Sequence, residues 1–537
     1  MPAWPGVSSV AELLARSARR QPDSPAIIAD GRAWSYADLW EASRTAAAGL
    51  QRAGIRTGDA VVLALPNGAE FFLAFFGTLI AGGIAVPVFP RTTPERLHAL
   101  ARLAGASGLV TAASFPADAL DALAKLSARD GRPVLTTADL ERAGLPGAVP
   151  DDPERPCYIQ YTSGSTADPR GVVITHRGLL ANIGQMIQAM DIVPGDVFVS
   201  WLPAYHDMGL SLMALTPVSL GARLVLLPTD LRDVTRWLRA IEAHHGTFTA
   251  GPDFAYRLCL RNVRDPQRFD LSSLKVCMNA SEPVRAGTLA GFEAAFGLRN
   301  AMMAGYGLAE ATLSVTCTPR GEPIGVDEDG RVCLGQPMPG TTVKVVGPGE
   351  LAPGQTGEIV VAGPSVCAGY HRNQEATAAL AWRHGYIRTG DLGYLDDSGR
   401  LYFAARQKDV IKLAGRTLYP QDAESVIDEV SGVRFSAAVG IDRGGIEGEQ
   451  LYVFAEVRDV AAKTVPELRA MSVQIVRVLH EALGIRPRGT ALLRPGRIPL
   501  TSNGKLQRGR LRDGFVGGRL VPGADIVFPL PFRSAVG

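Results

Sequence analysis

Apolar residues in the first part of the chain alternate between two spacings. Residues 10–20 carry apolar side chains at helical intervals, and Ser35 precedes a second helical stretch, which we expect it to cap. Residues 60–65 form a short, continuous apolar run typical of a buried strand. A helical stretch over 70–81 and another strand-like run at 84–88 follow. This β-α-β alternation predicts an α/β sandwich with largely parallel sheets.

A loop rich in hydroxyl groups lies between two short predicted strands. Residues 157–161 and 171–175 are apolar, β-branched or aromatic, so they predict a strand entering and a strand leaving the loop. The loop begins with Thr162, Ser163, Gly164, Ser165 and Thr166. Hydroxyl donors and a close backbone approach at glycine suit the oxygens of a polyphosphate, although composition alone favours a plain surface loop. A strand-loop-strand hairpin also differs from the phosphate loop of NTPases, which opens a helix and ends in Gly-Lys-Ser/Thr.

Length and composition restrict the class of protein. At 537 residues, 46% hydrophobic and 20% charged, the chain is long enough for two or more domains of a soluble enzyme. A net charge of +2 gives no reason to expect a nucleic acid or an anionic membrane as partner. The longest apolar stretch, residues 71–87, is interrupted by glycines, so we expect no membrane span. The six cysteines are scattered without a C-x-x-C pair, which favours free thiols and a cytoplasmic location.

Several later segments contain candidate chemistry. His206 lies between Pro203 and Gly209, in a turn rigid enough to aim its ring at a site, although a lone histidine is more often structural. Residues 246–256 predict a strand followed by a helix that Asp253 could cap, with aromatic residues that would line an acyl pocket or an ordinary core equally well. Residues 274–283 predict a strand that runs into a turn.

Taken in order, these segments resemble the motifs of the adenylate-forming superfamily, which includes acyl-CoA synthetases, peptide-synthetase adenylation domains and luciferases. Within it the chain looks most like the fatty acyl-AMP ligases. The resemblance extends from Arg32 to Lys505. It implies an α/β fold with a large N-terminal domain, residues 1–407, made of layered α/β sheets and a β-rich subdomain. A small mobile α+β domain, residues 408–537, would follow, and we expect the tail after residue 516 to be disordered.

The resemblance also implies roles for residues of the large domain. His206 would lie where the substrate carboxylate enters, and Glu310 would bind Mg²⁺, with Thr312 or its neighbours near the phosphates. A metal is needed because the carboxylate and ATP are both anions. The residues implied in nucleotide binding are Thr162, Ser163, Gly164, Ser165 and Thr166 at the phosphates, Ala280, Ser281, Tyr306 and Gly307 at the adenine, and Asp391 and Arg406 at the ribose.

The small domain would carry the moving parts. By resemblance, Lys408 is the hinge, Gly415 leaves room for a pantetheine arm in a thiol channel, and Lys505 bridges the substrate carboxylate and the α-phosphate. Rotation would let one site serve two half-reactions, because adenylation needs the lysine and the second step needs a path for a thiol.

Three departures from the family pattern affect the functional prediction. Ala167 and Arg170 stand where most members have Gly and Lys, although acyl-AMP ligases often lack that lysine. Only a short stretch separates Thr318 from Leu334, where true fatty acyl-AMP ligases carry an extra segment that hinders the use of CoA. Ala280 and Ala405 replace expected glycines and could crowd the nucleotide.

We therefore expect an ATP-dependent ligase that activates an apolar carboxylic acid as an acyl adenylate and transfers the acyl group to CoA, with ATP and Mg²⁺ as the other requirements. Three alternatives remain open. The acceptor could be the phosphopantetheine arm of an acyl carrier protein. The enzyme could perform only the thioester step with an adenylate made by a partner enzyme. The protein could also bind an acyl group or a nucleotide without turnover.

Overall fold

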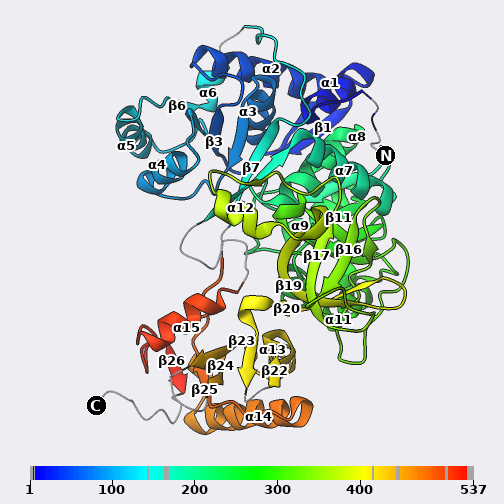
Figure 1. The fold of residues 1–537 in the computed structure, drawn as a ribbon, viewed down its shortest axis with the longest axis vertical. Coiled ribbons are helices and arrows are strands. Elements are labelled where there is room, and N and C mark those ends of the chain that lie inside the picture. Colours follow the sequence, from blue (N-terminus) through cyan, green and yellow to red (C-terminus); the bar gives the residue numbers. More distant parts are fainter. Residues whose placement is uncertain are drawn as a thin grey trace.

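The structure is a computed structural model that describes residues 4, 6–141, 144–162, 169–413, 416–442, 448–501 and 506–528. Its larger part contains two layered sheets with helices around them, and a smaller part below carries the C-terminal elements (Figure 1). The arrangement is the mixed α/β fold with a large and a small domain that the sequence predicted.

The first sheet contains the predicted hairpin. Its strands are β3 Ala60–Ala64, β4 Ile84–Pro87, β5 Gly108–Thr111, β6 Val134–Thr136, β7 Pro156–Thr162, β8 Arg170–Thr175 and β18 Gly369–Tyr370, in the order β18-β8-β7-β4-β3-β5-β6. The strands from β7 to β6 are parallel, as β-α-β units require, whereas β7 and β8 pair antiparallel. The strand-loop-strand prediction is confirmed, and the loop itself, residues 163–168, lies outside the described residues.

The second sheet supplies most of the candidate site. Its strands are β1 Pro25–Ala29, β2 Arg32–Ser35, β9 Val197–Ser200, β10 Arg223–Leu226, β11 Phe248–Gly251, β12 Val276–Asn279, β13 Met302–Gly307, β14 Ser314–Cys317 and β15 Gln336–Pro337, in the order β15-β14-β13-β12-β11-β9-β10-β1-β2. β11, β12 and β13 run parallel, so the turns that follow them lie along one edge of the sheet.

Helices of the large domain pack between and around these sheets. They are α1 Val10–Arg20, α2 Tyr36–Arg52, α3 Ala69–Ile80, α4 Pro94–Leu103, α5 Ala117–Ala128, α6 Thr137–Leu140, α7 His176–Ala189, α8 Thr216–Leu220, α9 Thr235–His244, α10 Asp253–Asn262, α11 Ala286–Phe296 and α12 Gln374–Leu380. Ser35 caps α2 as predicted, through a reciprocal capping box with Asp38. Phe71, Phe72 and Phe75 of α3 are fully buried, because this helix is covered on all sides.

A third, antiparallel sheet forms the β-rich part of the large domain. It consists of β16 Thr342–Val346, β17 Gly357–Ala362, β19 Ile387–Leu395 and β20 Leu401–Arg406, in that order. Asp391 of β19 is directly opposite Arg406 of β20, so the register of this sheet brings two predicted site residues together.

The small domain has its own sheet and its own buried core. The hairpin β21 Ile411–Leu413 and β22 Arg416–Leu418 precedes α13 Pro420–Asp428, β23 Val433–Asp442, β24 Glu449–Val457, α14 Val465–Leu483, β25 Gly489–Leu493, α15 Arg508–Val516 and β26 Ile526–Phe528. The segment up to Phe528, which we expected to be disordered, contributes β26, which pairs with β25. No helix among the described residues combines the length and the hydropathy that crossing a membrane requires.

Candidate active site

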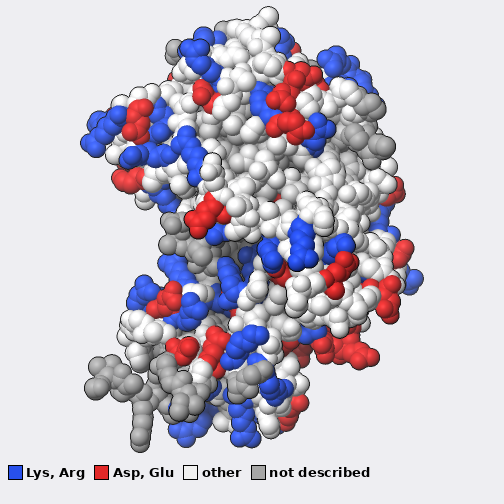
Figure 2. Space-filling model, in the orientation of Figure 1, with Lys and Arg blue, Asp and Glu red and all other residues white. Residues whose placement is uncertain are grey.

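A cavity of about 1250 Å³ opens where the large and small domains meet. Its lining includes the turns after β12 and β13, residues of β19 and β20, and α13 of the small domain. Lys and Arg side chains gather around the hollow between the two domains (Figure 2). A mixed polar and apolar cleft between domains is the usual place for a site that binds a small molecule.

Tyr306, Asp391 and Arg406 form a connected group on the cavity wall. The Tyr306 hydroxyl donates to Asp391 Oδ2 at 2.8 Å, and Arg406 Nε lies 3.3 Å from Asp391 Oδ1. The neighbouring Asp391 raises the pKa of Arg406, and burial together with Asp391 raises the pKa of the Tyr306 phenol, which therefore stays protonated as a donor. A carboxylate oxygen can accept more than one hydrogen bond, so Asp391 can also receive vicinal hydroxyls.

The predicted adenine region contains two aromatic rings and a turn with little room for side chains. The ring of Phe403 on β20 stacks near the Tyr306 ring, with centroids 6.3 Å apart and an interplanar angle of 27°. Ser281 has a φ of +73° and donates to Met208 Sδ at 3.5 Å, while its neighbour Ala280 is partly buried. At Gly307 an added Cβ would lie 1.8 Å from the Leu313 carbonyl oxygen, so only glycine fits this turn.

Glu310 lies on a one-turn 3-10 helix, Ala309–Ala311, directly after β13. Its Oε1 accepts a hydrogen bond from the Tyr370 hydroxyl at 2.7 Å. The guanidinium of Arg170, at the end of the predicted phosphate loop, lies 5.4 Å from the centroid of the Tyr370 ring. Tyr370 therefore connects the loop region with Glu310. Thr312 is buried, and its hydroxyl donates to the Ser365 carbonyl.

His206 lies in the rigid turn that its flanking residues predicted. An added Cβ on Gly209 would lie 2.0 Å from the Pro203 carbonyl oxygen, which requires a glycine there. His206 Nδ1 is 2.7 Å from Asp207 Oδ1, and the side chain of His206 lines the cavity. A π-helix, Met208–Leu215, begins directly after this turn.

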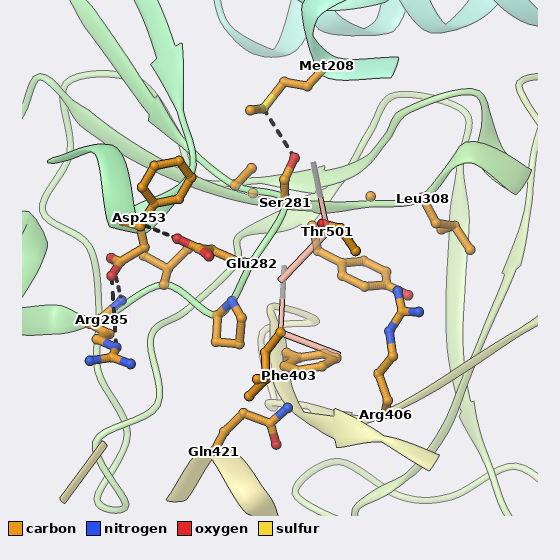
Figure 3. A pocket seen from close by; sticks show the side chains of 18 of the residues that line it. Met208, Asp253, Ser281, Glu282, Arg285, Leu308, Phe403, Arg406, Gln421 and Thr501 are labelled. Carbon is orange, nitrogen blue, oxygen red and sulfur yellow. Dashed lines mark hydrogen bonds and ion pairs between the residues drawn. The ribbon is translucent and has the colours of Figure 1, made fainter. Parts of the chain in front are cut away.

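A group of carboxylates and arginines forms another wall of the cavity. We expected Asp253 to cap α10. It is instead the first residue of this helix, and its Oδ1 accepts the backbone N–H of Arg285, just before α11, at 3.2 Å. Glu282 accepts the backbone N–H of Phe254. Burial and the nearby Asp253 raise the pKa of Glu282 to about 7. Asp253, Glu282 and Arg285 are visible together in Figure 3.

The small domain contributes the remaining predicted residues. Lys408 lies on a 3-10 turn, Gln407–Asp409, at the junction of the domains, and burial and the neighbouring Arg406 lower its pKa. Thr501 and Leu506, on either side of the segment with Lys505, line the cavity. Lys505, Gly415, Ser163, Gly164, Ser165 and Thr166 lie outside the described residues, as does the side chain of Thr162.

Sequence reasoning missed three residues of this site. Phe403 and Tyr370 lie far from Tyr306 and Glu310 in sequence, and they come close only because β20 and β18, which belong to two other sheets, pack against β13 and the turn that follows it. Glu282 directly follows the predicted turn residues. A carboxylate so soon after a buried strand was the one sequence signal that could have identified it as a site residue.

The residues present fit a nucleotide and its metal. Asp391, Arg406 and Tyr306 offer an acceptor, a cation and an aromatic face for a ribose and a base. Among the described residues, no group of three or more His, Cys, Asp and Glu side chains could hold a metal ion. Mg²⁺ bound through Glu310 alone would therefore take its other ligands from phosphates and water, as Mg²⁺ commonly does.

Comparisons with known proteins agree with this geometry. The family model described as AMP-binding enzyme matches residues 14–371. The medium-chain-fatty-acid acyl-carrier-protein ligase JamA of Moorena producens is 33% identical over 90% of this chain and 90% of its own. The long-chain-fatty-acid AMP ligase FadD26 of Mycobacterium bovis is 31% identical over 93% of this chain and 96% of its own. A structure solved in studies of fatty acyl-adenylate ligases from E. coli and L. pneumophila superposes with a TM-score of 0.85 at 26% identity, covering 96% of this chain and 98% of that one.

Proposed function

Because the chain belongs to the family of AMP-binding enzymes and is an ATP-dependent acyl-activating ligase, we propose that it joins an apolar carboxylic acid to the thiol of CoA through an acyl adenylate. The observation that carries this proposal is the connected group of Tyr306, Asp391 and Arg406 on the wall of the cavity between the domains, with Glu310 beside it. These side chains, which suit a nucleotide and its metal, line one cleft between the domains, and this supports the proposal.

The reaction has two steps. First, a carboxylate oxygen of the acid attacks the α-phosphorus of ATP, the bond to the β-phosphate oxygen breaks, and pyrophosphate leaves. Mg²⁺, when bound, neutralises phosphate charge. The groups that would hold the reactants are Asp391 and Arg406 at the ribose, Tyr306 and Phe403 at the base, and Lys505 at the carboxylate and the α-phosphate. Closure of the small domain over the cleft would keep water from the mixed anhydride.

In the second step the thiol attacks the acyl carbonyl carbon, its proton passes to solvent or to a base, and AMP leaves with the electron pair of the C–O bond. His206 lines the cavity with Nδ1 held by Asp207, so it is the candidate for contact with the carboxylate end of the acid. Rotation of the small domain about Lys408 would bring the segment around Gly415 to the site for this step.

Two observations favour different thiols. CoA is favoured by the short stretch between Thr318 and Leu334, which lacks the extra segment expected to hinder CoA. A carrier protein is favoured by the relatives, because JamA is named as a ligase that loads an acyl carrier protein. Both acceptors present the same pantetheine thiol, so the first half-reaction is common to the two proposals.

The test measures the two half-reactions on one preparation. Pyrophosphate release is followed with octanoic, dodecanoic and hexadecanoic acids plus ATP and Mg²⁺. Thioester formation is followed from synthetic dodecanoyl-AMP with CoA and, separately, with a carrier protein that bears its pantetheine arm. Pyrophosphate release that depends on the acid, together with dodecanoyl-CoA, is the expected result. Activity with the carrier protein alone would replace CoA as acceptor, and nucleotide binding without either product would refute the proposal.

A further inference from the structure

Helix α13 of the small domain is held to the large domain at both of its ends. Near its start, Asp422 Oδ2 accepts a hydrogen bond from Arg331 Nη2 at 3.0 Å. At its last residue, Asp428 Oδ2 lies 2.7 Å from Arg285 Nη1 and 3.5 Å from Arg257 Nη1. The two aspartates are six positions apart on the helix, about 9 Å along the axis. Two contacts at this spacing fix both the position and the direction of the helix.

The burial of these carboxylates and their positions on the helix indicate that their arginine partners stabilise this arrangement. The side chain of Asp428 is 6% exposed, and that of Arg331 is 16% exposed. A carboxylate at the C-terminal end of a helix is disfavoured by the helix dipole, so the arginines of the large domain must offset that cost for Asp428. An ion pair with little solvent access also holds its partners in one geometry more firmly than a surface pair does.

The other side of α13 is joined to the segment that carries Lys505. Glu424 of α13 accepts hydrogen bonds from the Arg508 guanidinium, one of them at 2.5 Å. Arg508 also binds Asp409, next to the hinge residue Lys408, at 3.1 Å. Arg508 is the first residue of α15 and lies three positions after Lys505. Arg508 thereby links α13 both to the residue next to the hinge and to the start of the helix that follows the Lys505 segment.

We propose that Asp422 and Asp428 are positioning residues that hold the small domain in the arrangement for adenylation, and thereby set the balance between the two half-reactions. This inference rests on the proposed function. In the present arrangement Thr501 and Leu506, which flank the Lys505 segment, line the cavity, whereas the hairpin β21–β22 contributes no lining residue within the part that the structure describes. Asp422 and Asp428 move with the small domain while their arginine partners stay behind, so rotation must break these pairs.

The test replaces the carboxylates by their neutral isosteres and measures the half-reactions separately. In Asp422→Asn, Asp428→Asn and the double variant, we expect the kcat of acid-dependent pyrophosphate release, measured with dodecanoic acid, to fall about ten-fold per site with little change in the KM of ATP. Thioester formation from synthetic dodecanoyl-AMP and CoA should be unchanged or faster. A purely structural role would lower both rates together.

Matched variants separate a positioning role from loss of charge alone. Asp329→Asn removes a different carboxylate from Arg331, at 2.6 Å. Asp329 belongs to the large domain and is 69% exposed, so the ratio of the two rates should not change. Asp422→Glu keeps the charge and should restore most of the adenylation rate. Arg331→Gln removes the partner of Asp422 from the large domain and should change the two rates as Asp422→Asn does. It replaces Asp422→Asn in the test if that variant folds poorly.

The outcomes distinguish the inference from the proposed function. A wild-type protein with neither half-reaction would refute the proposed function and this inference with it. A wild-type protein active in both, with Asp422→Asn and Asp428→Asn that keep its ratio of rates, would refute the inference alone. The inference alone would also be refuted if Asp329→Asn shifts the ratio of the two rates as much as Asp422→Asn does.

Discussion

Asp391 on the cavity wall contacts two other candidate site residues. Its carboxylate accepts from Tyr306 and faces Arg406, and its side chain is only 5% exposed. An ionised carboxylate only accepts hydrogen bonds, and the Arg406 cation lies beside this one. Such a group suits hydroxyl donors and no anion, and we propose that it binds the ribose of ATP.

The Asp391→Asn variant should therefore lose affinity for ATP more than turnover. A hydrogen bond to a charged acceptor contributes about 1.5–3 kcal/mol, so we expect the KM of ATP to rise about 10- to 100-fold. Pyrophosphate release at varied ATP, together with calorimetric titration of ATP, measures this. Tyr306→Phe removes one donor to the same carboxylate and should cost less. An unchanged KM in Asp391→Asn would place the ribose elsewhere.

The turn after β13 is the element on which the site depends most. It presents Tyr306 at its start and Glu310 a few residues later, and Gly307 closes it against the Leu313 carbonyl. The backbone N–H of Leu308 also donates to the Leu313 carbonyl at 2.9 Å, so this oxygen is fixed and cannot retreat from an added methyl group. Any larger residue at Gly307 must displace both candidate site residues together.

We expect Gly307→Ala to lower acid-dependent pyrophosphate release at least about 100-fold and to lower the melting temperature by several degrees, because a Cβ at 1.8 Å from a carbonyl oxygen forces the backbone apart. Gly195→Ala is the control, since an added Cβ there meets no atom within 4 Å and its φ is not positive. Near wild-type activity in Gly307→Ala would show that Tyr306 and Glu310 are not needed in their present positions.

The elements show which parts of the fold the sequence could predict. Local signals sufficed for α1, for the Ser35 cap of α2 and for the β7–β8 hairpin, because spacing, capping residues and β-branched runs act within a few residues. The π-helix after Asp207 and the use of Asp253 outside its own helix could not be predicted, because both depend on tertiary neighbours. At the site, sequence motifs pointed to Tyr306, Glu310, Asp391 and Arg406. The contacts of Tyr370 and Asp428 could not be predicted, because their partners are distant in sequence.

At the scale of the whole molecule, the two domains have separate cores and share one cavity. The small domain has its own buried residues, including Ile411, Ile427 and Val453, which pack within that domain. Contacts across the cavity are mainly polar and charged, such as the pairs of Asp422 and Asp428 with arginines of the large domain. Domains joined in this way unfold separately unless something bridges them.

Differential scanning calorimetry should therefore show two transitions for the free protein. A non-hydrolysable acyl-adenylate analogue, dodecanoyl-sulfamoyl-adenosine, would contact both walls of the cavity, and at 100 times its Kd it would add about 2.7 kcal/mol to the stability of the bound arrangement. The lower transition should then rise toward the upper one, and the two should merge. Asp391→Asn should bind the analogue more weakly, so the same concentration of analogue should leave its two transitions separate. A shift of the large-domain transition alone would show that the small domain does not take part in binding the adenylate, which would weaken the case for rotation about Lys408.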